Sequence, residues 1–251
     1  MAQATAPFLR GNMILVNGCS HTSGSEIEFY MQHECKDKAW PAHLGQLMNQ
    51  DVINIALAGS GNERISRTTI EWLIKNVQLQ QNYKPADLTV IIMWSGFDRF
   101  EEWNSRLKQF VSSQSDAFYD DKLPEFSEYA KYKKIINTWA SNEYKNLIYI
   151  LHTAVFLESL GIKYYFINGV QSFSTRDKFL KTGMASEFDT MYRGYGDNRI
   201  QKHLAFINEN ELPKHQLRDI PYAPHARWPH WDERGHKAWA TIVYNWINST
   251  D

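Results

Sequence analysis

The sequence predicts an α/β protein with a mainly parallel sheet between helices, and three observations support this fold class. Apolar runs of strand length alternate with segments of helical pattern along most of the chain. The first two apolar runs end in turns of small residues, as buried parallel strands do. The composition, 43% hydrophobic and 22% charged, is that of a folded protein. Strands and helices that alternate in this way place the strands side by side in parallel.

The elements of the first half follow from local patterns. Residues 1–12 are expected to form an arm. Short apolar runs predict strands at 13–16, 51–55 and 88–94. Helices are expected at 40–48 and 63–80, the second on the helical spacing of Ile65, Trp72 and Val77.

The second half alternates in the same way. The expected elements are a helix at 131–160, a strand at 163–167 and a helix at 232–247. The first of these has a broad apolar face and ends at Gly161, a natural C-cap residue. Asp232 is the expected N-cap of the last helix, because its side chain can accept free N–H groups of the first turn.

Two stretches carry no assigned element: a polar, aromatic-rich one at 98–128 and an irregular one at 170–222. The 251 residues contain no internal repeat and no linker, so a single domain is expected over 13–251. Its insertions, at about 100–128 and 170–222, are expected to shape access to a substrate, as long loops often do.

Composition and charge exclude several classes of function. Lys and Arg total 27 against 28 Asp and Glu, so no basic excess drives binding to nucleic acid or anionic lipid. Cys19 and Cys35 are too few for a disulfide framework. The longest strongly apolar run, 88–94, is too short for a membrane span. No basic segment followed by an apolar one begins the chain, so we expect no secretory signal and a cytoplasmic protein, unless it leaves by another route.

Ligands bind beyond the carboxyl ends of parallel strands, so the loops after the strands are where chemistry is expected. In the loop 18–24, Ser20 can point its hydroxyl into a cleft, and its N–H can stabilise negative charge. Alternatively, Ser20 only caps the next helix. In the loop 54–62, glycines let backbone amides approach a ligand, and Asn62 offers an uncharged donor. Alternatively, this loop is a simple turn with an Asn cap.

The third loop and a segment near the C-terminus carry ionisable side chains. Asp98 and Arg99 either contact a substrate or form a solvated ion pair. His230 precedes the cap of the last helix and is a candidate general base. His236 lies one turn into that helix, where it either serves the site or bonds a backbone carbonyl.

A metal site and a nucleotide site are weaker alternatives. Zinc could be bound by His225, His230, Asp232 and His236, but their spacing matches no standard zinc pattern. The glycines around Ser60 are too few for a dinucleotide fingerprint, and no P-loop lysine follows them. We therefore expect no metal and no other cofactor.

The motifs and their order resemble those of the SGNH (GDSL-type) hydrolases. The first block of that family is similar to Gly-Cys-Ser-His-Thr-x-Gly at 18–24, with Cys19 where Asp is usual. The loop 54–62 resembles the second block, and Gly-Phe-Asp at 96–98 stands where the third has Gly-x-Asn. The final block is similar to His-Trp-Asp-x-x-Gly-His at 230–236. In style the motifs are also similar to SGNH-like proteins of phages and marine bacteria.

The resemblance implies a flavodoxin-like, three-layer α/β/α sandwich and the activity of a serine esterase. Ser20 would be the nucleophile and His230 its general base. The oxyanion donors would be the backbone amides of Ser20 and Gly59, together with Asn62. The other polar residues of the blocks are accessory candidates: His21, Asp98, Arg99, Glu233 and His236.

Two departures from the family pattern concern the charge around the site. Asp98 replaces the Asn of the third block, and an ionised carboxylate opposes an oxyanion. Arg227 stands where an Asp is usual, three residues before the base, so a backbone carbonyl or a distant acid such as Asp219 would orient the base. Alternatively, Glu233 and His236 replace the pair.

These departures favour an alternative function, in which a catalytically degenerate SGNH-like fold serves as a binding or structural protein, including a virion component.

For an esterase, the substrate is expected to be a small-molecule or glycan ester. Aromatic faces suit sugar rings, and tryptophans stand at positions 94, 103, 228, 231 and 239. Alternatively, these side chains fill the core.

Overall fold

The computed structural model describes residues 12–25, 27, 34–96, 99–104, 109–114, 139–169 and 231–250. The expected arm apart from Asn12, most of the two expected insertions, and residues 131–138 of the expected long helix lie outside this part of the chain. Within it, the predicted alternation of strands and helices is confirmed.

Four strands form an all-parallel sheet in the order β2-β1-β3-β6. They are β1 (Met13–Asn17), β2 (Asp51–Asn54), β3 (Leu88–Trp94) and β6 (Lys163–Asn168). Strand β1 is paired on both edges, and its Leu15 lies opposite Ile53 of β2 and Val90 of β3. Numbered along the chain, these strands follow the flavodoxin-like order 2-1-3-4. The predicted fold class is therefore confirmed.

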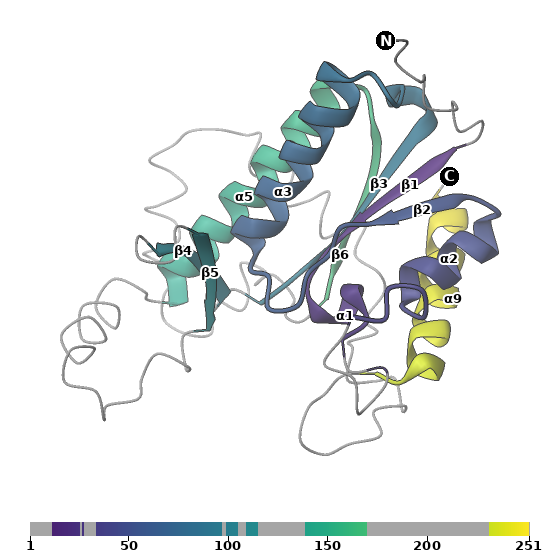
Figure 1. The fold of residues 1–251 in the computed structure, drawn as a ribbon, viewed down its shortest axis with the longest axis horizontal. Helices are drawn as coiled ribbons and strands as arrows, with labels where there is room; N and C mark the ends of the chain where they lie inside the picture. Colours follow the sequence, from purple (N-terminus) through teal and green to yellow (C-terminus); the bar gives the residue numbers. More distant parts are fainter. Residues whose placement is uncertain are drawn as a thin grey trace, which may run out of the picture.

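Helices cover both faces of this sheet (Figure 1). One face packs against α3 (Asn62–Leu73) and α5 (Trp139–Ser159), and the other against α2 (Trp40–Met48) and α9 (Glu233–Thr250). A π-helical segment, Ile74–Leu79, continues α3, and a 3-10 turn, Pro85–Asp87, leads into β3. Among the described helices, none is long and apolar enough to cross a membrane.

The central strands divide their side chains between two cores. Leu15 and Val90 belong to the core under α3 and α5, whereas Ile14 and Ile91 belong to the core under α2 and α9. Successive residues of a strand point to opposite faces, so a strand buried on both sides reads as an unbroken apolar run. This is why β1 and β3 could be recognised in the sequence.

Both predicted helix caps are confirmed. Gly161 follows α5 with a φ of +67°, a left-handed conformation that favours glycine. At the start of α9, the Asp232 carboxylate accepts the Gly235 N–H at 3.0 Å. Burial works against ionisation of Asp232, but hydrogen bonds from Gly235 and Arg234 and the Arg234 charge outweigh it and lower the pKa of Asp232.

An antiparallel hairpin of β4 (Arg99–Asn104) and β5 (Gln109–Gln114) occupies part of the polar, aromatic-rich stretch, where no strand is expected. Glu101 attaches it to α3, since its buried carboxylate pairs with Arg64 at 3.1 Å and with Arg67 at 2.8 Å. A buried carboxylate needs such partners to offset the cost of its desolvation. The attachment depends on two long-range ion pairs, which no local sequence pattern reveals.

The carboxyl end of β1 is fixed to α3 by the buried side chain of Asn17. Its amide nitrogen donates to the Ile65 carbonyl at 3.0 Å and to the hydroxyls of Thr68 and Thr69, each at 2.9 Å. Its carbonyl oxygen accepts the Gly18 N–H at 2.8 Å. One neutral side chain thus satisfies polar groups of two elements where the strand turns into a loop.

Replacing Asn17 by alanine should lower the free energy of unfolding by about 2 kcal/mol, because the buried Gly18 N–H loses its acceptor and the Ile65 carbonyl loses one of its donors. Asn82→Ala is the matched control, since Asn82 is exposed and its loss should cost less than about 0.5 kcal/mol. Urea unfolding followed by circular dichroism measures both values. Equal losses in the two variants would contradict the role given to Asn17.

Candidate active site

The loop after β1 presents Ser20 at the start of α1 (Ser20–Ser23), a single helical turn. Cys19 is the N-cap residue, and its carbonyl accepts the N–H groups of Thr22 and Ser23, each at 2.9 Å. Ser20, which is buried, is the first helical residue, so the alternative that it caps the helix is wrong. The Ser20 N–H thus lies in the first turn of α1, which is the position that an oxyanion donor at Ser20 requires.

Close packing and one long-range hydrogen bond fix this turn. A Cβ at Gly18 would overlap the Thr22 hydroxyl and lie 3.0 Å from the Met93 carbonyl, so a larger residue does not fit there. The Asn54 amide donates to the Thr22 carbonyl at 2.8 Å and ties the turn to the end of β2. Asn54 is thus a positioning residue that the sequence motifs do not identify, because its partner lies 32 residues away.

The loop after β2 carries Gly59 and Asn62. Gly59 has a φ of +75°, which favours glycine. Asn62 is the first residue of α3, and Gly61 is the N-cap, so the alternative of an Asn cap is wrong. The buried Asn62 amide nitrogen donates to the Ser95 carbonyl at 3.0 Å, and its oxygen accepts the Ser95 N–H at 2.7 Å. These bonds join the loops after β2 and β3 and use one of the two amide hydrogens.

The loop after β3 is described only in part. The Arg99 guanidinium donates to the Ser95 hydroxyl at 3.3 Å, so it turns back toward the end of β3. Asp98 lies outside the described residues, and a contact of Asp98 or Arg99 with a substrate stays a prediction.

Beside this loop, Glu63 is a half-buried acid in the first turn of α3. Burial raises the pKa of Glu63. The hydrogen bond that the Glu101 N–H donates to this carboxylate lowers the pKa, whereas the negative charge of Glu101 raises it. The net shift of the Glu63 pKa is upward. Burial also raises the pKa of Tyr149, as do the charge of Glu63 and the hydrogen bond to it. This edge of the site therefore holds a carboxyl group that keeps its proton to higher pH than an exposed one.

The structure separates the two members of the alternative pair Glu233 and His236. His236 is buried, and its Nδ1 accepts the Trp40 N–H at 3.1 Å, which places the proton of a neutral ring on Nε2. That tautomer leaves no ring nitrogen to accept a serine proton. Glu233 pairs with Lys237 at 2.7 Å, and this hydrogen bond lowers the pKa of Glu233. Nδ1 of His236 thus accepts a backbone N–H, and the expected bond from His236 to a backbone carbonyl stays a prediction for Nε2.

The start of the C-terminal segment meets the Ser20 turn. The rings of His21 and Trp231, both buried, have centroids 5.4 Å apart and planes at 62°. In Figure 1, α1 and the beginning of α9 lie at the same end of the sheet. His230 lies outside the described residues, as do Asp219 and Arg227, so the contact between the proposed nucleophile and base stays a prediction.

Three of the five tryptophans considered for a sugar-binding surface lie in the cores instead. Trp94, Trp231 and Trp239 are fully buried in the two cores. A face that packs against apolar side chains cannot stack on a ligand, so for these three residues the core alternative is correct. Trp228 and the side chain of Trp103 lie outside the described part.

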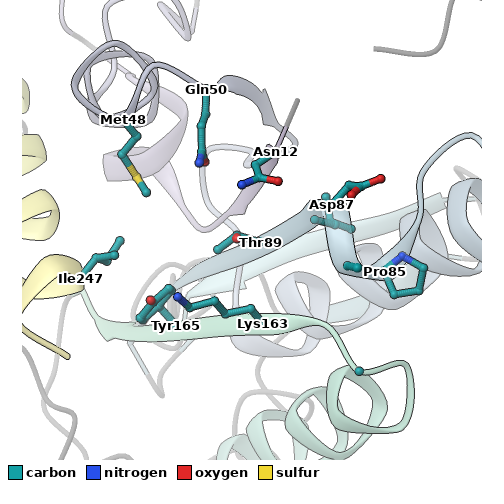
Figure 2. Close-up of a pocket in the computed structure, with 12 residues that line it drawn as sticks. Asn12, Met48, Gln50, Pro85, Asp87, Thr89, Lys163, Tyr165 and Ile247 are labelled. Carbon is teal, nitrogen blue, oxygen red and sulfur yellow. The ribbon is translucent and has the colours of Figure 1, made fainter. Parts of the chain in front are cut away.

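A cavity of about 280 Å³ lies at the other edge of the sheet, where the strands begin (Figure 2). Its lining includes Gln50 before β2, Asp87 before β3, and Lys163 of β6. None of the residues with a proposed catalytic role lines it.

Of the four residues considered for zinc, the structure describes two, Asp232 and His236. Asp232 caps α9, and His236 accepts the Trp40 N–H. Among the described residues, no group of three metal-ligating side chains gathers.

Known structures share this architecture at low sequence identity. A carbohydrate esterase whose active site displays divergent catalytic and non-catalytic binding functions is 12% identical; the match covers 99% of this chain and 67% of that one, with a TM-score of 0.50. A carbohydrate esterase family 2 enzyme with a carbohydrate-binding domain, from Corynascus thermopiles (Myceliophthora fergusii), is 12% identical over 98% of this chain and 68% of that one, also with a TM-score of 0.50. A protein described as lipolytic and of the G-D-S-L family, from Desulfitobacterium hafniense DCB-2, is 13% identical over 94% and 99% of the two chains, with a TM-score of 0.45.

The protein thus has the fold of the SGNH hydrolases. Residues 21–203 match the model of a family of unknown function, DUF6071, and the chain belongs to that family. No curated protein matches it.

The raised pKa of Glu63 predicts a gain of stability on its replacement by glutamine. The folded state holds the proton of Glu63 more tightly than the unfolded state does. The stability that this protonated carboxyl contributes is therefore fully present below the ordinary carboxyl pKa, and it is lost as the pH rises through the raised pKa of the folded state. At pH 7.5 Glu63→Gln should therefore melt at a higher temperature than the wild type, and at pH 4 the difference should vanish. Glu71→Gln, at an exposed site of the same helix, is the control and should show no such gain. A pH-independent difference for Glu63→Gln would contradict the explanation.

Proposed function

We propose that this protein is a serine esterase of the SGNH type, with Ser20 as nucleophile and His230 as general base. The observation that carries the proposal is that the motif loops are bonded to one another at the carboxyl edge of the sheet. Described contacts join the loop after β1 to the loop after β2, the loop after β2 to the loop after β3, and the loop after β1 to the start of α9. Side chains from separate parts of the sequence are thereby collected where open α/β folds bind ligands.

The proposed reaction is a two-step acyl transfer. Ser20 Oγ attacks the ester carbonyl carbon while His230 accepts the hydroxyl proton. The resulting oxyanion is bound by the N–H groups of Ser20 and Gly59. Collapse of the tetrahedral intermediate expels the alcohol, which takes the proton from His230, and leaves the acyl group on Ser20. In the second step, water attacks the acyl carbon and gives a proton to His230. The second tetrahedral intermediate then releases the acid, and the Ser20 oxygen takes the proton back from His230, so that both residues are restored.

Asn62 keeps a proposed role as a third oxyanion donor, through the amide hydrogen that Ser95 does not use. Loss of one donor in such a site costs about 10²–10³ in rate. The replacement of the third-block Asn by Asp98 is therefore compatible with a slower esterase. A backbone carbonyl or Asp219 is the proposed partner that orients His230.

An acylated carbohydrate is the first substrate class to test, because two of the structural neighbours are carbohydrate esterases. We further propose one domain over residues 13–251, with no resident cofactor and no nucleic-acid partner. Action in the cytoplasm or in a virion, and the likeness to proteins of phages and marine bacteria, stay predictions from the sequence.

A fluorophosphonate probe should label the folded wild-type protein, and Ser20→Ala should abolish the labelling because the probe reacts with an activated serine. Ser249→Ala, near the end of α9, is the matched control and should label like the wild type. Intact-mass analysis measures both. Folded wild type without label would favour the non-catalytic alternative, and labelled Ser20→Ala would mean that another residue is the nucleophile.

His230→Gln should lower the hydrolysis of p-nitrophenyl acetate by about 10²–10⁴-fold, the usual contribution of a general base. His152→Gln, at an exposed position of α5, should leave the rate unchanged. Initial rates at pH 7.5 measure both variants. A rate within twofold of the wild type for His230→Gln would exclude this histidine as the base.

A further inference from the structure

We infer that Trp231 is a positioning residue for Ser20 that acts through the ring of His21, an inference that rests on the proposed esterase function. The proposed mechanism gives Trp231 no part in the chemistry. Its indole nevertheless lies against the His21 ring at a centroid distance of 5.4 Å, with the planes at 62°. His21 follows Ser20 directly in α1.

The turn that carries Ser20 needs support from outside. A helix of four residues is far below the length at which helical hydrogen bonds alone give stability. Asn54 and the close packing at Gly18 hold the turn through Thr22. The contact between His21 and Trp231 holds it at the residue next to the nucleophile.

Trp231 is itself held rigidly. Its indole is buried and contacts the rings of His236 at 5.5 Å and Trp239 at 5.4 Å. A Cβ at Gly235 would lie 2.7 Å from the Trp231 Cβ, so only glycine allows the first turn of α9 to approach the indole this closely. Gly235, the glycine of the C-terminal motif, therefore has a packing role, because it leaves space for the Trp231 side chain.

The same contacts reach α2, on the same face of the sheet. His236 binds the N–H of Trp40, the first residue of α2, and so fixes the beginning of α9 to that helix. A chain of buried groups thus runs from α2 through His236, Trp231 and His21 to the Ser20 turn. Trp231 lies in the middle of this chain of contacts, so its position fixes the position of the Ser20 turn.

Catalysis is sensitive to such support, because a misplacement of a reacting group by about 1 Å can cost about 10²-fold in rate. Trp231→Phe keeps an aromatic ring but removes volume at the contact with His21. Trp246→Phe removes the same volume from the same core, and the ring contact of Trp246 is with Tyr165 of β6. The two variants should lose similar stability and differ in catalysis.

The experiment compares wild type, Trp231→Phe and Trp246→Phe in p-nitrophenyl acetate hydrolysis and in the rate of fluorophosphonate labelling. We expect Trp231→Phe to lower kcat and the labelling rate by about tenfold or more with KM within about twofold, because the nucleophile and not the substrate site is displaced. Trp246→Phe should keep both rates within about twofold of the wild type. Thermal unfolding of the three proteins checks that the comparison is made on folded chains.

Equal rates in the two variants, beside an active wild type, would overturn the role of Trp231 and leave the esterase proposal standing. A folded wild type that neither reacts nor labels would overturn both. If Trp231→Phe does not fold, His21 tests the same contact from α1. His21→Ala should then slow the reaction and His21→Phe, which keeps a ring, should restore most of it; equal losses in these two would overturn the inference.

Discussion

Strand β1 is hydrogen-bonded along both edges, to β2 and to β3, and the rest of the structure depends on this pairing. Its apolar side chains are buried on both faces, so a slip of one residue would exchange the two cores. The register of β1 is therefore fixed more firmly than that of a strand at the edge of the sheet. The turn that carries Ser20 leaves the end of this strand and inherits its position from it.

Neutral amides build the edge of the sheet where the strands end. Asn17, Asn54 and Asn62 each hold backbone groups of another element. An amide offers a donor and an acceptor without the desolvation cost of a charge, which suits a buried place. Charged side chains take part as well: Glu101 pairs with two arginines of α3, Arg99 donates to the Ser95 hydroxyl, and Glu34 accepts the Ala58 N–H. The three asparagines thus supply the buried bonds between the loops and their neighbours without adding a net charge.

The parts of the fold that depend on neighbouring residues could be predicted from the sequence. The helix at 40–48, the strand at 88–94 and the caps Gly161 and Asp232 follow from runs of apolar residues and from single side chains. The β4–β5 hairpin could not be predicted, because two ion pairs between Glu101 and distant residues of α3 attach it. His236 could not be interpreted either, since its partner Trp40 lies 196 residues away. The order of the motifs predicted which loops would meet, but the roles of Ser20 and His230 stay predictions.

The bond between Trp40 and His236 also has a consequence for the order in which the protein matures. Folding during synthesis proceeds from the N-terminal side, and contacts between distant residues form late. Before α9 emerges from the ribosome, the sheet face that carries Ile14 and Ile91 lacks one of its two covering helices. The nascent chain therefore exposes an apolar surface that invites association with other chains or with a chaperone.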